Sequence, residues 1–190
     1  MLTRLRGCLP VLVLALSGAR AASLTRLDNP ETGLSRWRLD LPVLHLELAQ
    51  RLPDQVRGFF LARGFPSALA DAFARACVFQ VIARNVGERA PLVIDLAAWR
   101  VRREGEARPL PDKQTWLNSW RAAGLAPAAA LAFRWATFPE RQRFAPGDYN
   151  WGMLGFGPAP GESFDLQLVW REGDEPKSRW IRNLQCAEDK

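Results

Sequence analysis

The sequence predicts a mainly β protein, an antiparallel β-sandwich with short helices added. Two observations lead to this prediction. Short segments such as 77–84 and 164–170 alternate apolar and polar residues, which is the period of a half-buried strand. Turn sequences rich in Gly, Pro and Asn separate these segments, and few stretches show helical spacing. A chain of 190 residues is expected to form a single domain, which we place at 37–190.

The first 21 residues have the pattern of a secretory signal peptide. Arg4 and Arg6 precede a short apolar run, and Ala19 and Ala21 supply the small residues of a cleavage site. We expect cleavage after Ala21 and a mature protein that is periplasmic or secreted. No later stretch is apolar for long enough to span a bilayer, so we expect no stable membrane span after cleavage.

The charge of the chain gives no case for a nucleic-acid partner. The formal net charge is +6, and the expected leader holds three arginines and no acid, so the mature chain has 23 basic against 20 acidic residues. The basic residues are scattered rather than grouped in a patch. We therefore expect no nucleic-acid binding.

Two cysteines remain after the expected cleavage, Cys77 and Cys186. In an oxidising compartment an even pair predicts one disulfide. The alternative is a reactive or metal-binding pair, but the chain contains no C-x-x-C spacing, which makes redox exchange the weaker interpretation.

The first part of the mature chain is predicted to hold one strand and two helices. Residues 22–36 are interpreted as a polar lead-in, and 37–48 alternate well enough for a strand. A helix is expected over 53–63, because proline suits its first turn and apolar residues follow at helical spacing. A second short helix is expected over 67–75, with Ser67 as its N-cap.

The rest of the chain is predicted to be mostly strands. A strand over 77–84 ends in a turn, and another strand follows it. A helix is expected over 112–123, and 128–137 is interpreted as a further strand. The last two strands are expected over 164–170 and 180–186. The sequence shows no internal repeat.

Three turn sequences resemble those of secreted immunoglobulin-like β-sandwich domains. They are Asn85-Val86-Gly87 before a strand that starts at Pro91, Pro146-Gly147-Asp148-Tyr149, and Pro160-Gly161-Glu162-Ser163-Phe164. The resemblance covers 76–186 at most, and it implies an immunoglobulin-like fold without implying a function. It also implies a tyrosine corner, in which the Tyr149 phenol bonds back to the backbone. The chain departs from these domains in the position of its second cysteine and in its added helices.

Few residues could carry chemistry. His45 is the only histidine and therefore the only imidazole available as a base, with Glu47 on the same strand face to orient it. The simpler interpretation is a surface histidine on a strand. Zinc and copper sites need several soft ligands, and Gly-rich phosphate loops are absent from the sequence. We expect no metal and no cofactor.

The candidate binding residues are mostly aromatic. Most of the eight tryptophans fall on the apolar face of their element and are expected in the core. Trp151, with Tyr149 and Met153 beside it, lies close to a loop rich in Gly and Pro, where such folds bind ligands. Phe59 and Phe60 are adjacent in the first helix, so either one faces a partner or both are buried, and we favour burial.

These observations predict an exported, non-catalytic binding or accessory protein that docks on another extracytoplasmic protein or complex. One alternative is a carbohydrate-binding module that uses exposed tryptophan. Another is a small enzyme with His45 as its base. The residues expected at the binding site are Trp151, Tyr149, Met153, Phe59, Phe60 and His45.

Overall fold

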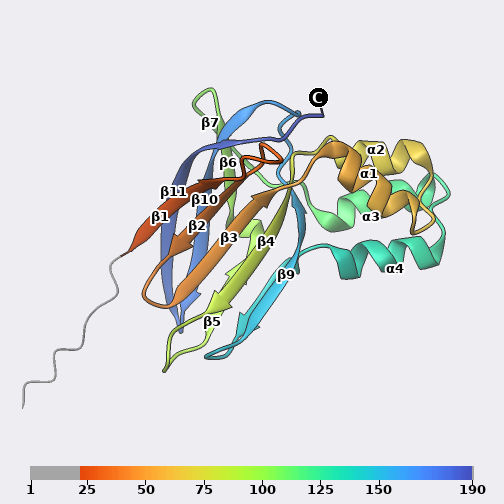
Figure 1. Ribbon diagram of the computed structural model, residues 1–190. Coiled ribbons are helices and arrows are strands. Elements are labelled where there is room, and N and C mark those ends of the chain that lie inside the picture. Colours follow the sequence, from red (N-terminus) through yellow and green to blue (C-terminus); the bar gives the residue numbers. More distant parts are fainter. Residues whose placement is uncertain (1–21, 190) are drawn as a thin grey trace, which may run out of the picture.

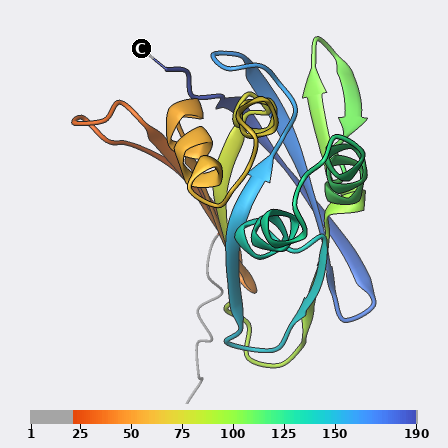
Figure 2. The same ribbon diagram turned by 90° about the vertical axis from the view of Figure 1, so that its right-hand side faces the viewer.

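Two antiparallel sheets packed face to face form the body of the molecule (Figure 1). The computed structural model describes residues 22–189, and the expected signal peptide at 1–21 lies outside this range. The predicted fold class, a mainly β sandwich with added short helices, is confirmed. The four helices lie together on one side of the sandwich (Figure 1, Figure 2). None of the helices in the described part of the chain has the length and apolarity to cross a membrane.

The first sheet, sheet A, has five strands in the order β1-β2-β3-β4-β9. Its strands are β1 (Ser23–Asp28), β2 (Ser35–Asp40), β3 (Leu44–Gln50), β4 (Val78–Asn85) and β9 (Tyr149–Gly155). All of its strand pairs are antiparallel. Strands β1 and β9 therefore form its two edges.

The second sheet, sheet B, is centred on the long strand β10. This strand pairs with β11 along one side and with β6 and β5 along the other, while β7 and β8 extend the sheet. The strands are β5 (Leu92–Asp95), β6 (Arg100–Arg103), β7 (Glu106–Pro109), β8 (Arg141–Phe144), β10 (Ser163–Glu172) and β11 (Glu175–Gln185). A short 3-10 helix at Leu96–Ala98 separates β5 from β6.

A hydrophobic core fills the space between the sheets. Phe79 and Val81 point into it from sheet A, and Leu166 and Leu168 face them from sheet B. Because side chains alternate across a strand, the period-two patterns in the sequence do mark one buried face per sheet.

The N-terminal part of the fold differs from the prediction in two ways. The single strand expected over 37–48 is wrong, because a turn at 41–43 divides it into β2 and β3, which pair with Leu39 opposite Leu46. The buried apolar positions are odd-numbered up to Leu41 and even-numbered from Leu44, and this change of phase is the signal that marks the turn. The expected lead-in, 22–36, contains β1, whose residues are all exposed and therefore leave no apolar period to read.

Two helical hairpins are inserted between strands. The first joins β3 to β4, and the second follows β7 and precedes β8. The first consists of α1 (Pro53–Leu61) and α2 (Ser67–Ala74), and the second of α3 (Lys113–Ala122) and α4 (Pro127–Ala136). Helices α1, α2 and α3 match the expected helices, although the N-cap of α2 is Pro66 rather than Ser67.

The strand predicted over 128–137 is wrong, because this segment forms helix α4. Leu131, Phe133 and Trp135 alternate in sequence, but in the helix Phe133 is buried while the other two are exposed. Alanine, the strongest helix former, dominates the segment, and Pro127 occupies the first helical position, where proline is favoured. These local preferences outweigh a three-residue alternation.

The two hairpins are built alike at positions 60 residues apart, although no repeat was expected. Helices α1 and α3 begin at Pro53 and Lys113. Gly64 and Gly124 lie in the two turns with φ of 78° and 88°. This left-handed conformation suits glycine and ends each helix in the same way.

The hairpins share a second hydrophobic core with the same symmetry. Phe73 and Phe133 occupy equivalent positions, and their rings meet edge to face at a centroid distance of 5.0 Å. Phe60 contacts Phe133 at 5.6 Å, and its counterpart Trp120 contacts Phe73 at 6.2 Å. Phe60 of the first hairpin thus contacts Phe133 of the second, and Trp120 of the second contacts Phe73 of the first. The two contacts are equivalent, so the hairpins pack with approximate two-fold symmetry.

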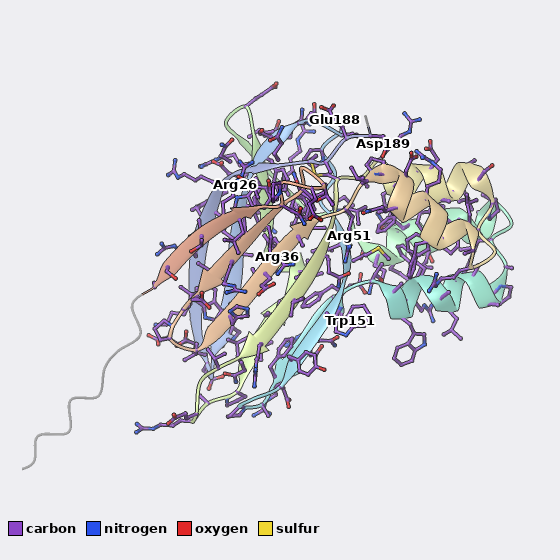
Figure 3. The ribbon with its side chains drawn as sticks, in the orientation of Figure 1. Arg26, Arg36, Arg51, Trp151, Glu188 and Asp189 are labelled. Atoms are coloured by element: carbon purple, nitrogen blue, oxygen red, sulfur yellow. A yellow bond between two sulfur atoms is a disulfide. The ribbon has the colours of Figure 1, made fainter. Side chains whose placement is uncertain are left out.

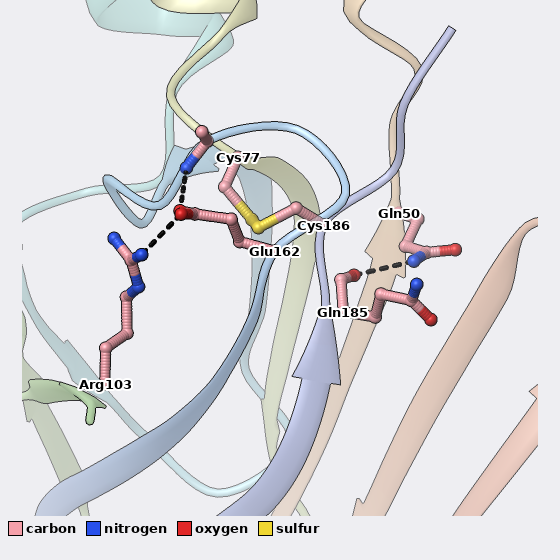
Figure 4. The surroundings of a disulfide bond; sticks show 7 residues. Gln50, Cys77, Arg103, Glu162, Gln185 and Cys186 are labelled. Carbon is pink, nitrogen blue, oxygen red and sulfur yellow. Dashed lines mark hydrogen bonds and ion pairs between the residues drawn. A yellow bond between two sulfur atoms is a disulfide. The ribbon is translucent and has the colours of Figure 1, made fainter. Parts of the chain in front are cut away.

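The predicted disulfide is present. Cys77 precedes β4 in sheet A, and Cys186 follows β11 in sheet B, so the bridge ties the two sheets together (Figure 4). Both cysteines are buried. Beside the bridge, the Gln50 side-chain amide donates to the Gln185 carbonyl at 2.6 Å, which makes a second link between the sheets.

The tyrosine corner implied by the immunoglobulin-like resemblance is not formed. Tyr149 starts strand β9 as expected, but 64% of it is exposed, on the outer face of sheet A. Asn85 organises the nearby turns instead. Its side-chain amide donates to the Ala90 and Phe144 carbonyls, and its side-chain oxygen accepts from the Gly87 N–H.

Candidate functional site: an aromatic groove beside sheet A

Strand register sets rows of side chains across the outer face of sheet A. The first row is Asp40, His45, Arg84 and Tyr149, and the second is Arg38, Glu47, Ile82 and Trp151. In each row the members on β2 and β3 are polar or charged, and the member on the edge strand β9 is aromatic. The face therefore changes from charged to aromatic as it approaches the helices.

A groove of about 600 Å³ lies where this aromatic edge meets helices α1 and α4. We call it the aromatic groove, and define it by Arg51, Phe59, Arg63, Gln80, Trp135, Trp151 and Met153. Figure 3 shows Arg51 and Trp151 on the part of the sheet that lies next to the helices. The groove thus combines side chains from the sandwich with side chains from both hairpins.

Exposed aromatic rings are the main feature of the aromatic groove. Trp135 is 80% exposed and Trp151 is 58% exposed. Phe59 is partly buried, and the Arg63 guanidinium lies 3.4 Å from its ring centroid. The buried tryptophans, as expected for core residues, are Trp37, Trp99, Trp120 and Trp170. Exposed tryptophans grouped on one groove are typical of interaction sites.

The polar groups of the groove are mostly hydrogen-bond donors. Its charged lining residues, within the described part of the chain, are Arg51 and Arg63, and no carboxylate lines it. The Gln80 side-chain oxygen accepts from Arg51 at 3.4 Å, while its buried Nε2 has no hydrogen-bond partner among residues 22–189. The Gln55 side-chain oxygen is used by the Leu52 N–H at the start of α1. The groove therefore offers positive charge and donors, and few free acceptors.

The structure brings three of the six expected binding residues together. Trp151, Met153 and Phe59 all line the aromatic groove. Tyr149 lies on the same sheet face, two residues before Trp151, but does not line the groove. Burial was expected for both phenylalanines. Phe60 is fully buried in the helical core, whereas Phe59 is only partly buried and reaches the groove.

His45 lies apart from the groove, within the charged part of the face. Its Nδ1 is 2.6 Å from Asp40 Oδ1, and its Nε2 is 3.2 Å from Glu47 Oε1. The Arg38 guanidinium also donates to Glu47, at 3.0 Å. A carboxylate oxygen thus lies within hydrogen-bond distance of each ring nitrogen.

Sequence reasoning missed Arg51, Arg63 and Trp135. Trp135 was placed on the same face as Phe133, but two residues on a helix differ by about 200° in direction, so the two rings point opposite ways. The alanine-rich composition after Pro127 was the signal that could have corrected this. The arginines carried no signal, because their neighbours in the groove come from distant parts of the chain.

No group of three or more His, Cys, Asp or Glu side chains in residues 22–189 is arranged to hold a metal ion.

Comparison with protein-family models, with curated proteins and with solved structures finds no match to this chain. The functional conclusion therefore rests on the geometry of the site.

Proposed function

We propose that this protein is an exported, non-catalytic binding protein, and that its aromatic groove docks an acidic segment of another extracytoplasmic protein. The observation that carries the proposal is a pair of exposed tryptophans, Trp135 and Trp151, on a groove whose charged residues are both arginines. Tryptophan and arginine are the residues that most often dominate the binding energy of protein interfaces. The buried disulfide supports an oxidising compartment.

The charge of the groove selects the chemistry of the partner segment. Arg51 and Arg63 have no carboxylate beside them in the groove. A carboxylate on the partner would pair with these donors, and a charge-assisted hydrogen bond of this kind is stronger than a neutral one. Apolar side chains of the segment would cover the two tryptophans.

The shortage of acceptors favours a protein partner over a neutral sugar. Sugar hydroxyls need acceptors as well as donors, and the side-chain oxygens of Gln55 and Gln80 are already engaged. The stacking surface of Trp135 and Trp151 keeps the carbohydrate-binding alternative testable in the same experiment. The enzymatic alternative has less support, because both nitrogens of His45 face carboxylates.

The test is a binding assay with two synthetic peptide libraries. In one library Asp or Glu stands next to Leu or Phe, and in the other Asn and Gln replace the acids. We expect the acidic library to bind at least about tenfold more tightly, the size of one charge-assisted hydrogen bond. Arg51→Glu with Arg63→Glu should abolish the preference, while the matched control Arg179→Glu, on the exposed part of β11, should keep it.

Trp135→Ala with Trp151→Ala should weaken binding of both libraries, because it removes the apolar contact shared by all peptides. Equal binding of the two libraries by the unmodified protein would contradict the acidic-segment proposal. Binding of neutral oligosaccharides in competition with the peptides, lost in the tryptophan variant, would favour the carbohydrate-binding alternative instead.

A further inference from the structure

A second hollow lies between the sandwich and the helical hairpins. Its volume is about 330 Å³, which falls in the range of small-molecule sites. Leu96 and Leu154 reach it from the sandwich core, and Phe73, Trp116 and Phe133 reach it from the helical core. We call it the junction cavity, and define it by these five residues. Ligand sites are frequent where two packed units meet, as the two cores do here.

The charged groups on the junction cavity are mainly acidic. Asp95, Asp112 and Glu140 line it, and Lys113 is its one basic residue within the described part of the chain. The Lys113 ammonium is already used, because it donates to the Phe138 carbonyl at 2.8 Å. Burial lowers the pKa of Lys113, while the nearby Glu140 carboxylate opposes that shift. Among the charged residues of the rim, carboxyl groups therefore outnumber ammonium groups by three to one.

Two of these acids form a close pair. Asp112 and Glu140 lie near enough to share a hydrogen bond, which requires one of the two carboxyls to hold a proton. Burial and the neighbouring Asp112 raise the pKa of Glu140, and the shared hydrogen bond lowers the pKa of Asp112. A positive group between the two carboxyls could take the place of that proton and interact with both.

We propose that the junction cavity binds a small organic cation, with a primary ammonium group at Asp112 and Glu140 and an aromatic or hydrocarbon body against Phe73, Trp116 and Phe133. The apolar wall takes the body out of water, and the rim charges select the ammonium group. Aromatic rings beside a cation add a favourable cation–π interaction. The protein as a whole is basic, so a preference for cations would come from this rim. The proposal does not depend on the aromatic groove.

Isothermal titration calorimetry at neutral pH and low salt tests the proposal with three probes of one shape: benzylamine, benzyl alcohol and benzoate. We expect benzylamine to bind at least about tenfold more tightly than benzyl alcohol, and benzoate to bind most weakly. Asp112→Asn with Glu140→Gln should remove the preference for benzylamine. Asparagine keeps the helix N-cap of α3, so this variant is expected to fold.

Two controls separate the cavity from a general charge effect. Glu104→Gln removes an exposed acid from the turn between β6 and β7 and should leave all three affinities unchanged. Ala97→Phe places a ring on the exposed rim and should weaken the binding of benzylamine and of benzyl alcohol to a similar extent. Equal binding of amine and alcohol, tighter binding of benzoate, or no binding of any probe would each overturn the proposal.

Discussion

The two helical hairpins have nearly the same inner face and quite different outer faces. Inside, Phe73 and Phe133 are both buried at equivalent positions. Outside, the first hairpin is closed by ion pairs, in which Asp71 accepts from Arg57 and from Arg75, each at 2.8 Å. The second hairpin instead presents Trp135 to solvent, on the side that borders the aromatic groove.

This difference separates what the fold requires from what it leaves open. The inner positions are fixed because each ring has to fit against rings of the other hairpin, and close packing tolerates little change in volume. The outer positions have no such constraint, so one hairpin can carry a charge network while the other carries an exposed ring. A large apolar residue at an unconstrained position is therefore the better sign of binding.

The largest expected effect comes from breaking the symmetric centre. Phe133→Ala and Phe73→Ala should each lower the free energy of unfolding by about 3–5 kcal/mol, because both remove a buried ring from the same cluster. Urea denaturation with the disulfide intact measures this. Leu131→Ala, on the exposed face of α4, is the control and should change it by less than about 0.5 kcal/mol. A small effect at Phe73 alone would contradict the symmetry.

A smaller and matched effect is expected at the two turns. Gly64→Ala and Gly124→Ala should each lower the free energy of unfolding by about 1–2 kcal/mol, because both positions have positive φ. An added Cβ would meet no atom within 4 Å at either position, so the cost comes from the backbone alone. Gly58→Ala, in the exposed interior of α1, also meets no neighbour but should stabilise by about 0.5–1 kcal/mol. Thermal unfolding of the three variants gives the comparison. Unequal costs at the two turns would show that the hairpins end differently.

The starts of the hairpins differ, and pH should reveal it. Asp112 caps α3 with its side chain and pairs with Glu140, whereas the side chain of Leu52, the N-cap of α1, makes no capping hydrogen bond. The pKa of Glu140 is raised above 4.5 in the folded state, so its ionisation costs stability as pH rises from 4.5 through that raised pKa. Glu140→Gln should therefore be more stable than the unmodified protein at neutral pH and approach it in acid. Parallel stability curves across this range would contradict the prediction.

The smallest effect on stability is expected at the exposed ring. Trp135→Ala should change the free energy of unfolding by less than about 0.5 kcal/mol, because its side chain packs on little. The matched variant Trp120→Ala, in the core of the same hairpin, should cost about 3–5 kcal/mol. Denaturant unfolding of both variants measures the contrast. A large loss at Trp135 would mean that this ring is structural.

The sequence predicted the parts of the fold that have a local signal. Alternation marked β4 and β10, and a proline at the first helical position marked α1. The pair Cys77–Cys186 followed from the two cysteines left after the expected cleavage and from the expected oxidising compartment. Strand β1 was missed because it has no buried face. The turn at 41–43 was missed because apolar residues alternate on both sides of it, although their phase changes there.

The candidate sites were harder to predict, because distant segments build them. Trp151 was identified, but Arg51 and Trp135 join it only through the packing of α1 and α4 beside sheet A. The junction cavity had no signal at all, since Asp112 and Glu140 belong to a helix cap and a connecting loop. Sequence periods report burial within one element, and these sites depend on contacts between elements.

Because of the disulfide, proteolytic cleavage in the two hairpins gives different products. Arg121 lies between Cys77 and Cys186, so a tryptic cut there leaves two pieces joined by the bridge, and the nicked protein keeps its full mass until it is reduced. Arg63 lies before Cys77, outside the bridged segment, so a cut there produces two pieces with no covalent link between them. Gel electrophoresis with and without reductant would therefore show which hairpin a protease opened first.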